Sequence, residues 1–106
     1  MVSFNDFKKM EIVIAKVLEV NDHPNADKLY VMKIDLGGET RQIVAGIRPY
    51  YKKEELLGKQ IVVVKNLEPA VIRGVESNGM LLAAKDDKSL SILIPDKTLE
   101  IGSPVS

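Results

Sequence analysis

Short apolar runs rich in Val, Ile and Leu alternate along the chain with clusters of turn-forming residues, at intervals of eight to twelve residues. This spacing predicts a small antiparallel β structure. The longest run, residues 11–20, is partly apolar on both faces, with Lys16 and Glu19 interspersed, and predicts a long first strand that bends between two layers. Further strands are predicted at residues 29–36, 40–45, 61–64, 71–75, 80–84 and 90–94.

Glycine, proline and polar residues predict the connections between these strands. Residues 21–27 contain His-Pro-Asn-Ala-Asp and predict a loop, because Pro24 fixes one φ angle and the Asn and Asp side chains can bond their own backbone. Gly37-Gly38 predicts a hairpin turn, and residues 50–57 predict a short helix that stops at Gly58. A helix capped by Ser3, a loop at 67–70, a bend at 74–79, a turn at 86–87 and an irregular tail from residue 95 complete the pattern.

An all-β fold with a five-stranded barrel and one short helix between the third and fourth strands is the layout of an OB-fold. The pattern alone leaves other small β folds open. A chain of 106 residues has the length of one domain and can bury one core. We therefore predict a single domain, with an N-terminal extension at residues 1–10, a barrel at 11–94 and a C-terminal extension at 95–106.

Composition excludes several kinds of chemistry. The absence of Cys excludes disulfides and thiolate nucleophiles, and the single histidine, His23, leaves no pair of imidazoles for a metal site. Neither a glycine-rich phosphate loop nor a catalytic constellation is present, so we predict no enzymatic activity, cofactor or metal. No apolar run approaches the ~20 residues of a membrane span, which makes the cytoplasm the expected compartment.

Any nucleic-acid site must be a local patch, because 15 basic side chains are balanced by 15 acidic ones. Cationic, amide and hydroxyl side chains near strand ends would suit a sugar–phosphate backbone, although each lysine can equally be a solvated surface residue. Arg73 is the most distinctive, as one of three arginines and the residue before a glycine in an apolar run. Few aromatic side chains are present, which favours folded RNA read by shape over stacking on an extended strand. The polar candidates are Asn25, Lys28, Lys33, Arg41, Arg48, Lys65, Asn66, Arg73, Ser77 and Asn78.

Three segments carry a resemblance to a known family. They are HPNADKL at residues 23–29, RQIVAGI at 41–47 and NLEPAVIRGVESNGMLLAA at 66–84. In this order they resemble the tRNA-binding module appended to methionyl-tRNA synthetases, which also occurs in free-standing bacterial tRNA-binding proteins and in cytokine-like synthetase cofactors. The resemblance extends from residue 4 to residue 103.

The resemblance implies an OB-fold barrel with terminal extensions, which build a homodimer in the free-standing or bacterial-type members, and non-catalytic binding of tRNA by shape. By matched position, the resemblance implies that the contacts are Asn25, Lys28, Arg41, Arg73, Ser77 and Met80. We add Lys33 from the polar candidates named above. The expected dimer residues are Phe4, Phe7, Ile101 and Val105. Relatives often carry Lys where this chain has Glu68 and Val71, a difference that would weaken the phosphate contribution to binding.

The leading interpretation is a tRNA-binding homodimer that raises the local tRNA concentration for a methionyl-tRNA synthetase. It would be either the C-terminal appendage of that enzyme or its separately encoded beta-type subunit, and the initial Met of a chain that holds only the module favours the second. Two alternatives stay open. One is a protein-binding chaperone of the CsaA type, and the other is a structural dimerisation module of a synthetase.

Overall fold

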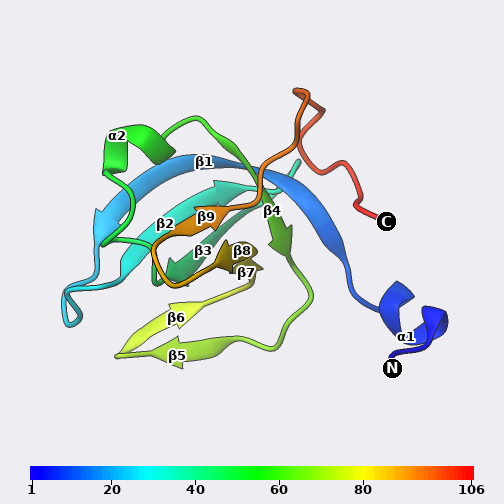
Figure 1. Cartoon of the computed structure of the whole chain (residues 1–106), viewed down its shortest axis with the longest axis horizontal. Helices are drawn as coiled ribbons and strands as arrows, with labels where there is room; N and C mark the ends of the chain where they lie inside the picture. The colour runs from blue at the N-terminus through cyan, green and yellow to red at the C-terminus, as the bar shows by residue number, and fades with distance from the viewer.

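The computed structural model describes residues 1–106, and its longest element is the curved strand β1 (Ile12–Asp22) (Figure 1). The two halves of β1 have different antiparallel partners. Its second half pairs with β2 (Tyr30–Asp35), and its first half pairs with β4 (Gln60–Val64). The register with β2 shifts between Val17 and Glu19, just after the point where the two pairings meet at Lys16. The prediction of a long first strand that joins two layers is confirmed.

The remaining strands extend this pair of ladders into a nearly closed barrel. Strand β3 (Thr40–Ala45) follows β2 and strand β7 (Met80–Leu81) follows β4, which gives the order β3-β2-β1-β4-β7. The gap between β3 and the β6–β7 segment is bridged by the amide of Asn78, which donates to the carbonyl of Gln42 at 2.8 Å. The expected OB-fold architecture is therefore confirmed.

The short helix α2 (Lys53–Leu56) lies between β3 and β4 in the chain, as predicted, and supplies the fully buried Leu56. Alternation along β2 sends Tyr30, Met32 and Ile34 into the interior and leaves Lys33 outside. The core consists of Val13, Ala15, Val17, Val20, Tyr30, Met32, Ile34, Leu36, Ile43, Ala45, Ile47, Leu56, Ile61, Val63, Leu81 and Ile92.

The prediction of single strands at residues 71–75 and 80–84 is wrong. The first region is a hairpin of β5 (Ala70–Ile72) and β6 (Val75–Ser77), with Arg73 and Gly74 as its two-residue turn. Both turn residues have positive φ, 52° and 88°, which matches the right-handed twist of the paired strands. An arginine in this conformation is uncommon, so the sequence resembled a continuous strand. The second region divides into β7 and β8 (Ala83–Lys85), and β8 forms a separate hairpin with β9 (Leu90–Ile92).

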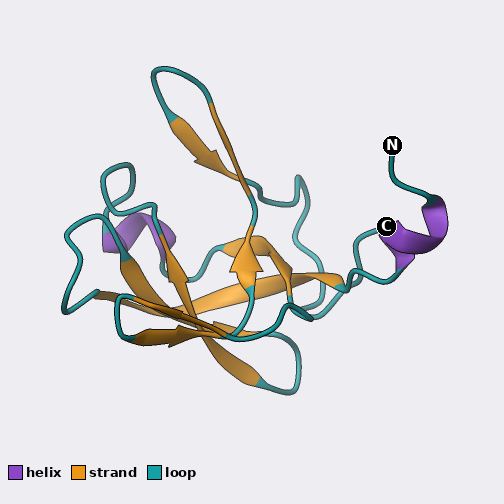
Figure 2. Cartoon of the chain, turned by 90° about the horizontal axis from the view of Figure 1, so that it is seen from below, coloured by secondary structure: helices purple, strands orange, loops and turns teal.

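The two chain ends differ in their contact with the barrel. Helix α1 (Phe4–Lys8) begins at the predicted cap, because Ser3 Oγ accepts a hydrogen bond from the Asp6 amide, and it stands apart from the barrel in Figure 2. The C-terminal tail instead returns to β1, where the Ile14 amide donates to the Ser103 carbonyl and the Val105 amide donates to the Ile12 carbonyl. No helix has the length and apolar character needed to cross a membrane.

Candidate nucleic-acid interface

Two loops that are far apart in the sequence meet at one end of the barrel. Figure 1 shows the loop after β1 next to the tip of the β5–β6 hairpin. The two segments exchange two hydrogen bonds. Asn25 Nδ2 donates to the Arg73 carbonyl and Arg73 Nη2 donates to the Asn25 carbonyl, each at 3.2 Å. We call residues 23–29 together with residues 72–74 the loop clamp. In an OB-fold, the loops at these places in the topology are used to bind oligonucleotides.

A buried histidine completes the loop clamp. The His23 side chain is 4% exposed, and its Nδ1 accepts a hydrogen bond from the Asn25 amide at 2.9 Å. Its Nε2 lies 2.9 Å from the Ile72 carbonyl, which can only accept. These partners require the neutral ring with its proton on Nε2. From sequence, His23 was expected to be an ordinary loop residue, and nothing in a proline-bearing turn indicates a partner 49 positions away.

The loop clamp borders a hollow of about 440 Å³ that presents positive charge. Lys28 and Arg73 line it and are exposed, and neither forms an ion pair with a carboxylate. Asp27 is the one acidic residue among the lining side chains. Two cations without carboxylate partners beside an amide donor form a suitable surface for phosphate groups. The structure thus brings together three predicted site residues, Asn25, Lys28 and Arg73.

Arg41 lies away from the loop clamp. It is four residues from the Ala45 end of β3, a distance of roughly 13 Å along a strand. Its guanidinium pairs with Glu39 at 3.2 Å and also donates to the Lys65 carbonyl. Lys33 is exposed on the outer face of β2, next to Gln42 of β3. Of these two cations, Lys33 is therefore the one without an internal partner.

Ser77 has a structural role in the barrel. The side chain is 4% exposed, its Oγ accepts from the Val44 amide at 2.9 Å, and it donates to the Gly79 carbonyl at 3.1 Å. Met80 is 47% exposed and lines a different cavity of about 490 Å³, which is mostly apolar and lies between the hairpin and β7. Neither residue borders the hollow of the loop clamp.

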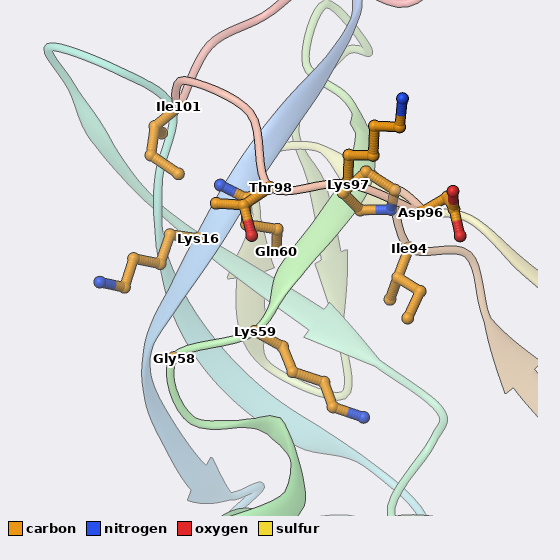
Figure 3. A pocket seen from close by; sticks show the side chains of 10 residues that line it. Lys16, Gly58, Lys59, Gln60, Ile94, Asp96, Lys97, Thr98 and Ile101 are labelled. Atoms are coloured by element: carbon orange, nitrogen blue, oxygen red, sulfur yellow. The ribbon is translucent and has the colours of Figure 1, made fainter.

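A third hollow, of about 410 Å³, lies between β1, the start of β4 and the C-terminal tail, and we call it the tail hollow (Figure 3). Lys16, Lys59 and Lys97 surround it, but their ammonium groups point in different directions in Figure 3. The Gln60 side chain holds the tail here, because its Nε2 donates to the Leu99 carbonyl and its Oε1 accepts from the Leu99 amide. Since the three charges diverge, this hollow does not form a site for one small anion. No cluster of three or more His, Cys, Asp or Glu side chains that could hold a metal occurs in the chain.

An OB-fold barrel with free cations and an amide donor on its loops is a nucleic-acid-binding type of module. Residues 12–104 match the family described as "Putative tRNA binding domain". The methionine–tRNA ligase of Thermococcus kodakarensis is 56% identical over 98% of this chain. The chain belongs to this tRNA-binding domain family. It spans 14% of the length of that ligase.

Solved structures of two kinds share the whole fold. The structure of a MetRS-related protein from Pyrococcus horikoshii has a TM-score of 0.93 and 30% identity, and covers 100% of this chain and 98% of its own. A CsaA chaperone protein from Picrophilus torridus has a TM-score of 0.92 and 33% identity, with 100% of both chains covered. The same barrel therefore occurs in proteins that are described in different functional terms.

Proposed function

We propose that this module binds tRNA through the loop clamp. Lys28 and Arg73 contact phosphate groups, and the Asn25 side chain helps to fix the position of the RNA on the surface. The observation that carries this proposal is the pair of exposed, unpaired cations held beside one hollow by hydrogen bonds between the two loops. Lys33 adds a further cation on the neighbouring outer face of β2.

Recognition depends on the shape and backbone of a folded RNA. The charge of the chain is balanced overall, so a long unstructured polyanion gains little beyond the loop clamp. Five aromatic side chains are present, and Tyr30 is buried with its hydroxyl donating to the Tyr51 carbonyl at 2.7 Å. A row of stacking platforms for single-stranded bases is therefore lacking. The dispersed backbone contacts that remain suit a folded RNA.

The biological partner in this proposal is a methionyl-tRNA synthetase. The support is the set of relatives described as methionine–tRNA ligases, in which the matching region is a small part of a much longer chain. The module would act in the cytoplasm, as part of such an enzyme or as its separate subunit. Binding to two sites on one assembly raises the effective tRNA concentration at the enzyme.

The test compares two double variants that remove the same charge from different places. Lys28→Gln with Arg73→Gln removes two cations from the loop clamp, and Lys16→Gln with Lys97→Gln removes two from the tail hollow. We expect the first variant to reduce the salt dependence of tRNA binding by roughly 0.7–0.9 per lost phosphate contact, and the second to leave it unchanged. Equal effects of the two variants would contradict a site at the loop clamp.

We also propose that two copies associate through the N-terminal extension. Phe4 is 73% exposed and Phe7 39% exposed on a helix that the barrel does not cover. Val105 is partly exposed beside β1, whereas Ile101 is half-buried against the chain's own tail hollow and contributes less. Sedimentation at micromolar concentration should give the mass of a dimer, and Phe4→Ser with Phe7→Ser should give the monomer. A monomeric mass for the unaltered protein would contradict the dimer.

A second candidate function is binding of apolar peptide segments. The cavity of about 490 Å³ is lined by Leu67, Ile72 and Met80 among other apolar residues, and the fold is shared with a protein described as a CsaA chaperone. Burial of apolar surface does not depend on charge. Peptide binding that is insensitive to salt, and that Met80→Asp removes, would support this function. Salt-dependent tRNA binding unaffected by Met80→Asp would favour the first proposal.

A further inference from the structure

His23 connects the two loops of the loop clamp, although it is buried and cannot touch the RNA itself. Its ring joins the Asn25 amide on one loop to the Ile72 carbonyl on the other. Both residues that the ring contacts are tied to Arg73. Asn25 exchanges two hydrogen bonds with Arg73, and Ile72 directly precedes Arg73 at the hairpin turn.

We propose that neutral His23 is the positioning residue of the RNA site. It holds the loop after β1 and the hairpin tip at the spacing that keeps Lys28 and Arg73 on one surface. The inference rests on the proposed tRNA function and names the group that controls its geometry. A side chain that fixes binding groups in place lowers the ordering cost of binding without contacting the ligand.

A second proton on the ring would break one of these two links. A proton on Nδ1 would face the Asn25 amide, placing a donor against a donor, while the Nε2 hydrogen bond to the Ile72 carbonyl would persist. The same proton adds a positive charge, which by itself would strengthen attraction to RNA. Loss of the Asn25 link should lower the affinity for tRNA, whereas the added charge should raise it. Whether affinity falls or rises as the pH is lowered therefore distinguishes the two effects.

The charged groups on the surrounding elements leave the ring bonded only to the backbone. Asp22 precedes it on β1, but that carboxylate pairs with Arg48 at 3.5 Å and with Lys53 at 3.3 Å. The other charged side chains are Lys16 and Glu19 on β1, both exposed, Asp27 and Lys28 on its own loop, and Arg73 and Glu76 on the hairpin. No carboxylate is hydrogen-bonded to the ring, so a proton on Nδ1 would have no acceptor among its present partners.

The single histidine makes the experiment direct, because its ring signals in an NMR spectrum need no assignment among several. Affinity for tRNA and the ring signals would be followed together as the pH is lowered until the ring signals shift. We expect affinity to fall roughly fivefold to tenfold as the ring gains its second proton, which is the loss expected for one hydrogen bond that orders the site. The amide signals of Asn25 and Arg73 should shift with the same midpoint.

Two variants separate the two links. In His23→Asn, the amide oxygen lies near the position of Nδ1, so the Asn25 amide keeps an acceptor. In His23→Gln, the amide nitrogen lies near the position of Nε2, so the Ile72 carbonyl keeps a donor. Neither side chain titrates. We expect both variants to stay folded by circular dichroism, to bind tRNA more weakly than the unaltered protein at pH 8, and to lose the pH dependence.

Affinity that rises as His23 gains its proton, or variants that match the unaltered protein at pH 8, would overturn the proposal. Absence of tRNA binding at every pH would contradict the proposed function instead. In that case, the amide signals still test the role of His23. Asn25 and Arg73 signals that do not move with the ring titration would overturn it independently of RNA.

Discussion

The two ends of β1 are held in place by different interactions. Residues 12–15 are all buried, and they lie between β4 on one edge and the C-terminal tail on the other. Beyond Val20 the chain leaves the core and enters the loop clamp, whose links are the hydrogen bonds of His23 and Asn25. Apolar burial depends on area and not on direction, whereas hydrogen bonds require direction. The first end therefore supplies stability, and the second supplies the geometry of the proposed binding surface.

The largest effect is expected from a change in the core. Ile61 is fully buried on β4 opposite Ala15 of β1, and Ile61→Ala leaves a cavity there. We expect a loss of roughly 2–5 kcal/mol in the free energy of unfolding, measured by urea denaturation. Affinity for tRNA at a temperature where the variant is folded should be unchanged. A folded variant with weakened affinity would mean that the two ends of β1 are coupled.

Ser77→Ala tests the closure of the barrel next to the loop clamp. Val44 is only 8% exposed, and the variant leaves its amide without a hydrogen-bond acceptor. We expect a loss of roughly 1–3 kcal/mol in unfolding free energy and no change in tRNA affinity of the folded protein. The exposed Ser91→Ala is the matched control. Lowered affinity with unchanged stability would instead make Ser77 an RNA contact, as the resemblance implied.

Arg73→Ala should give the opposite pattern. Alanine keeps the Cβ atom, so the backbone strain at φ 52° stays the same, and the exposed side chain contributes little to packing. We expect about a tenfold loss of tRNA affinity, equivalent to about 1.4 kcal/mol, and a thermal midpoint that is nearly unchanged. Lys88→Ala, which removes a cation from the β8–β9 turn, serves as control. A large loss of stability with unaltered binding would assign Arg73 to the fold.

The smallest effect is expected at the β8–β9 turn. The amides of Lys88 and Ser89 donate to Asp86 Oδ1, and these bonds hold the pKa of that carboxyl below its ordinary value of 3.8. A lowered folded-state pKa contributes stability that is present above the unfolded-state pKa and is lost as pH falls through the folded one. The difference in thermal midpoint between the unaltered protein and Asp86→Ala should therefore shrink as the pH falls below 3.8 and disappear below the lowered folded-state pKa. A difference that persists in acid would assign the effect to turn conformation.

The barrel could be predicted because its signals are local. Alternation along β2, the Gly37-Gly38 turn and the short helix before β4 each follow from neighbouring residues. The β5–β6 hairpin could not be found in this way, because its turn places an arginine at positive φ where pattern reasoning expects a strand to continue. The turn between β8 and β9 was predicted at residues 86–87, but the break between β7 and β8 was not, because only Leu82 separates these two strands.

The candidate site was predicted in its residue types but not in its geometry. Asn25, Lys28 and Arg73 were identified as polar residues at strand ends, and the structure brings them together. Sequence could not reveal that Arg41 is occupied by Glu39 and the Lys65 carbonyl, because those contacts depend on side-chain direction and on a distant strand. The hydrogen bonds of the His23 ring were missed for the same reason.

The most direct test of the central claim is a fluorescence-anisotropy titration of the unaltered protein with tRNA and with an unstructured RNA of equal length, at low and physiological salt. We predict preferential binding of tRNA, with an affinity that falls with salt along a slope of a few released counterions, because only a few unpaired cations border the loop clamp. Equal affinity for the two RNAs, or no binding at either salt, would contradict recognition of folded tRNA by this surface.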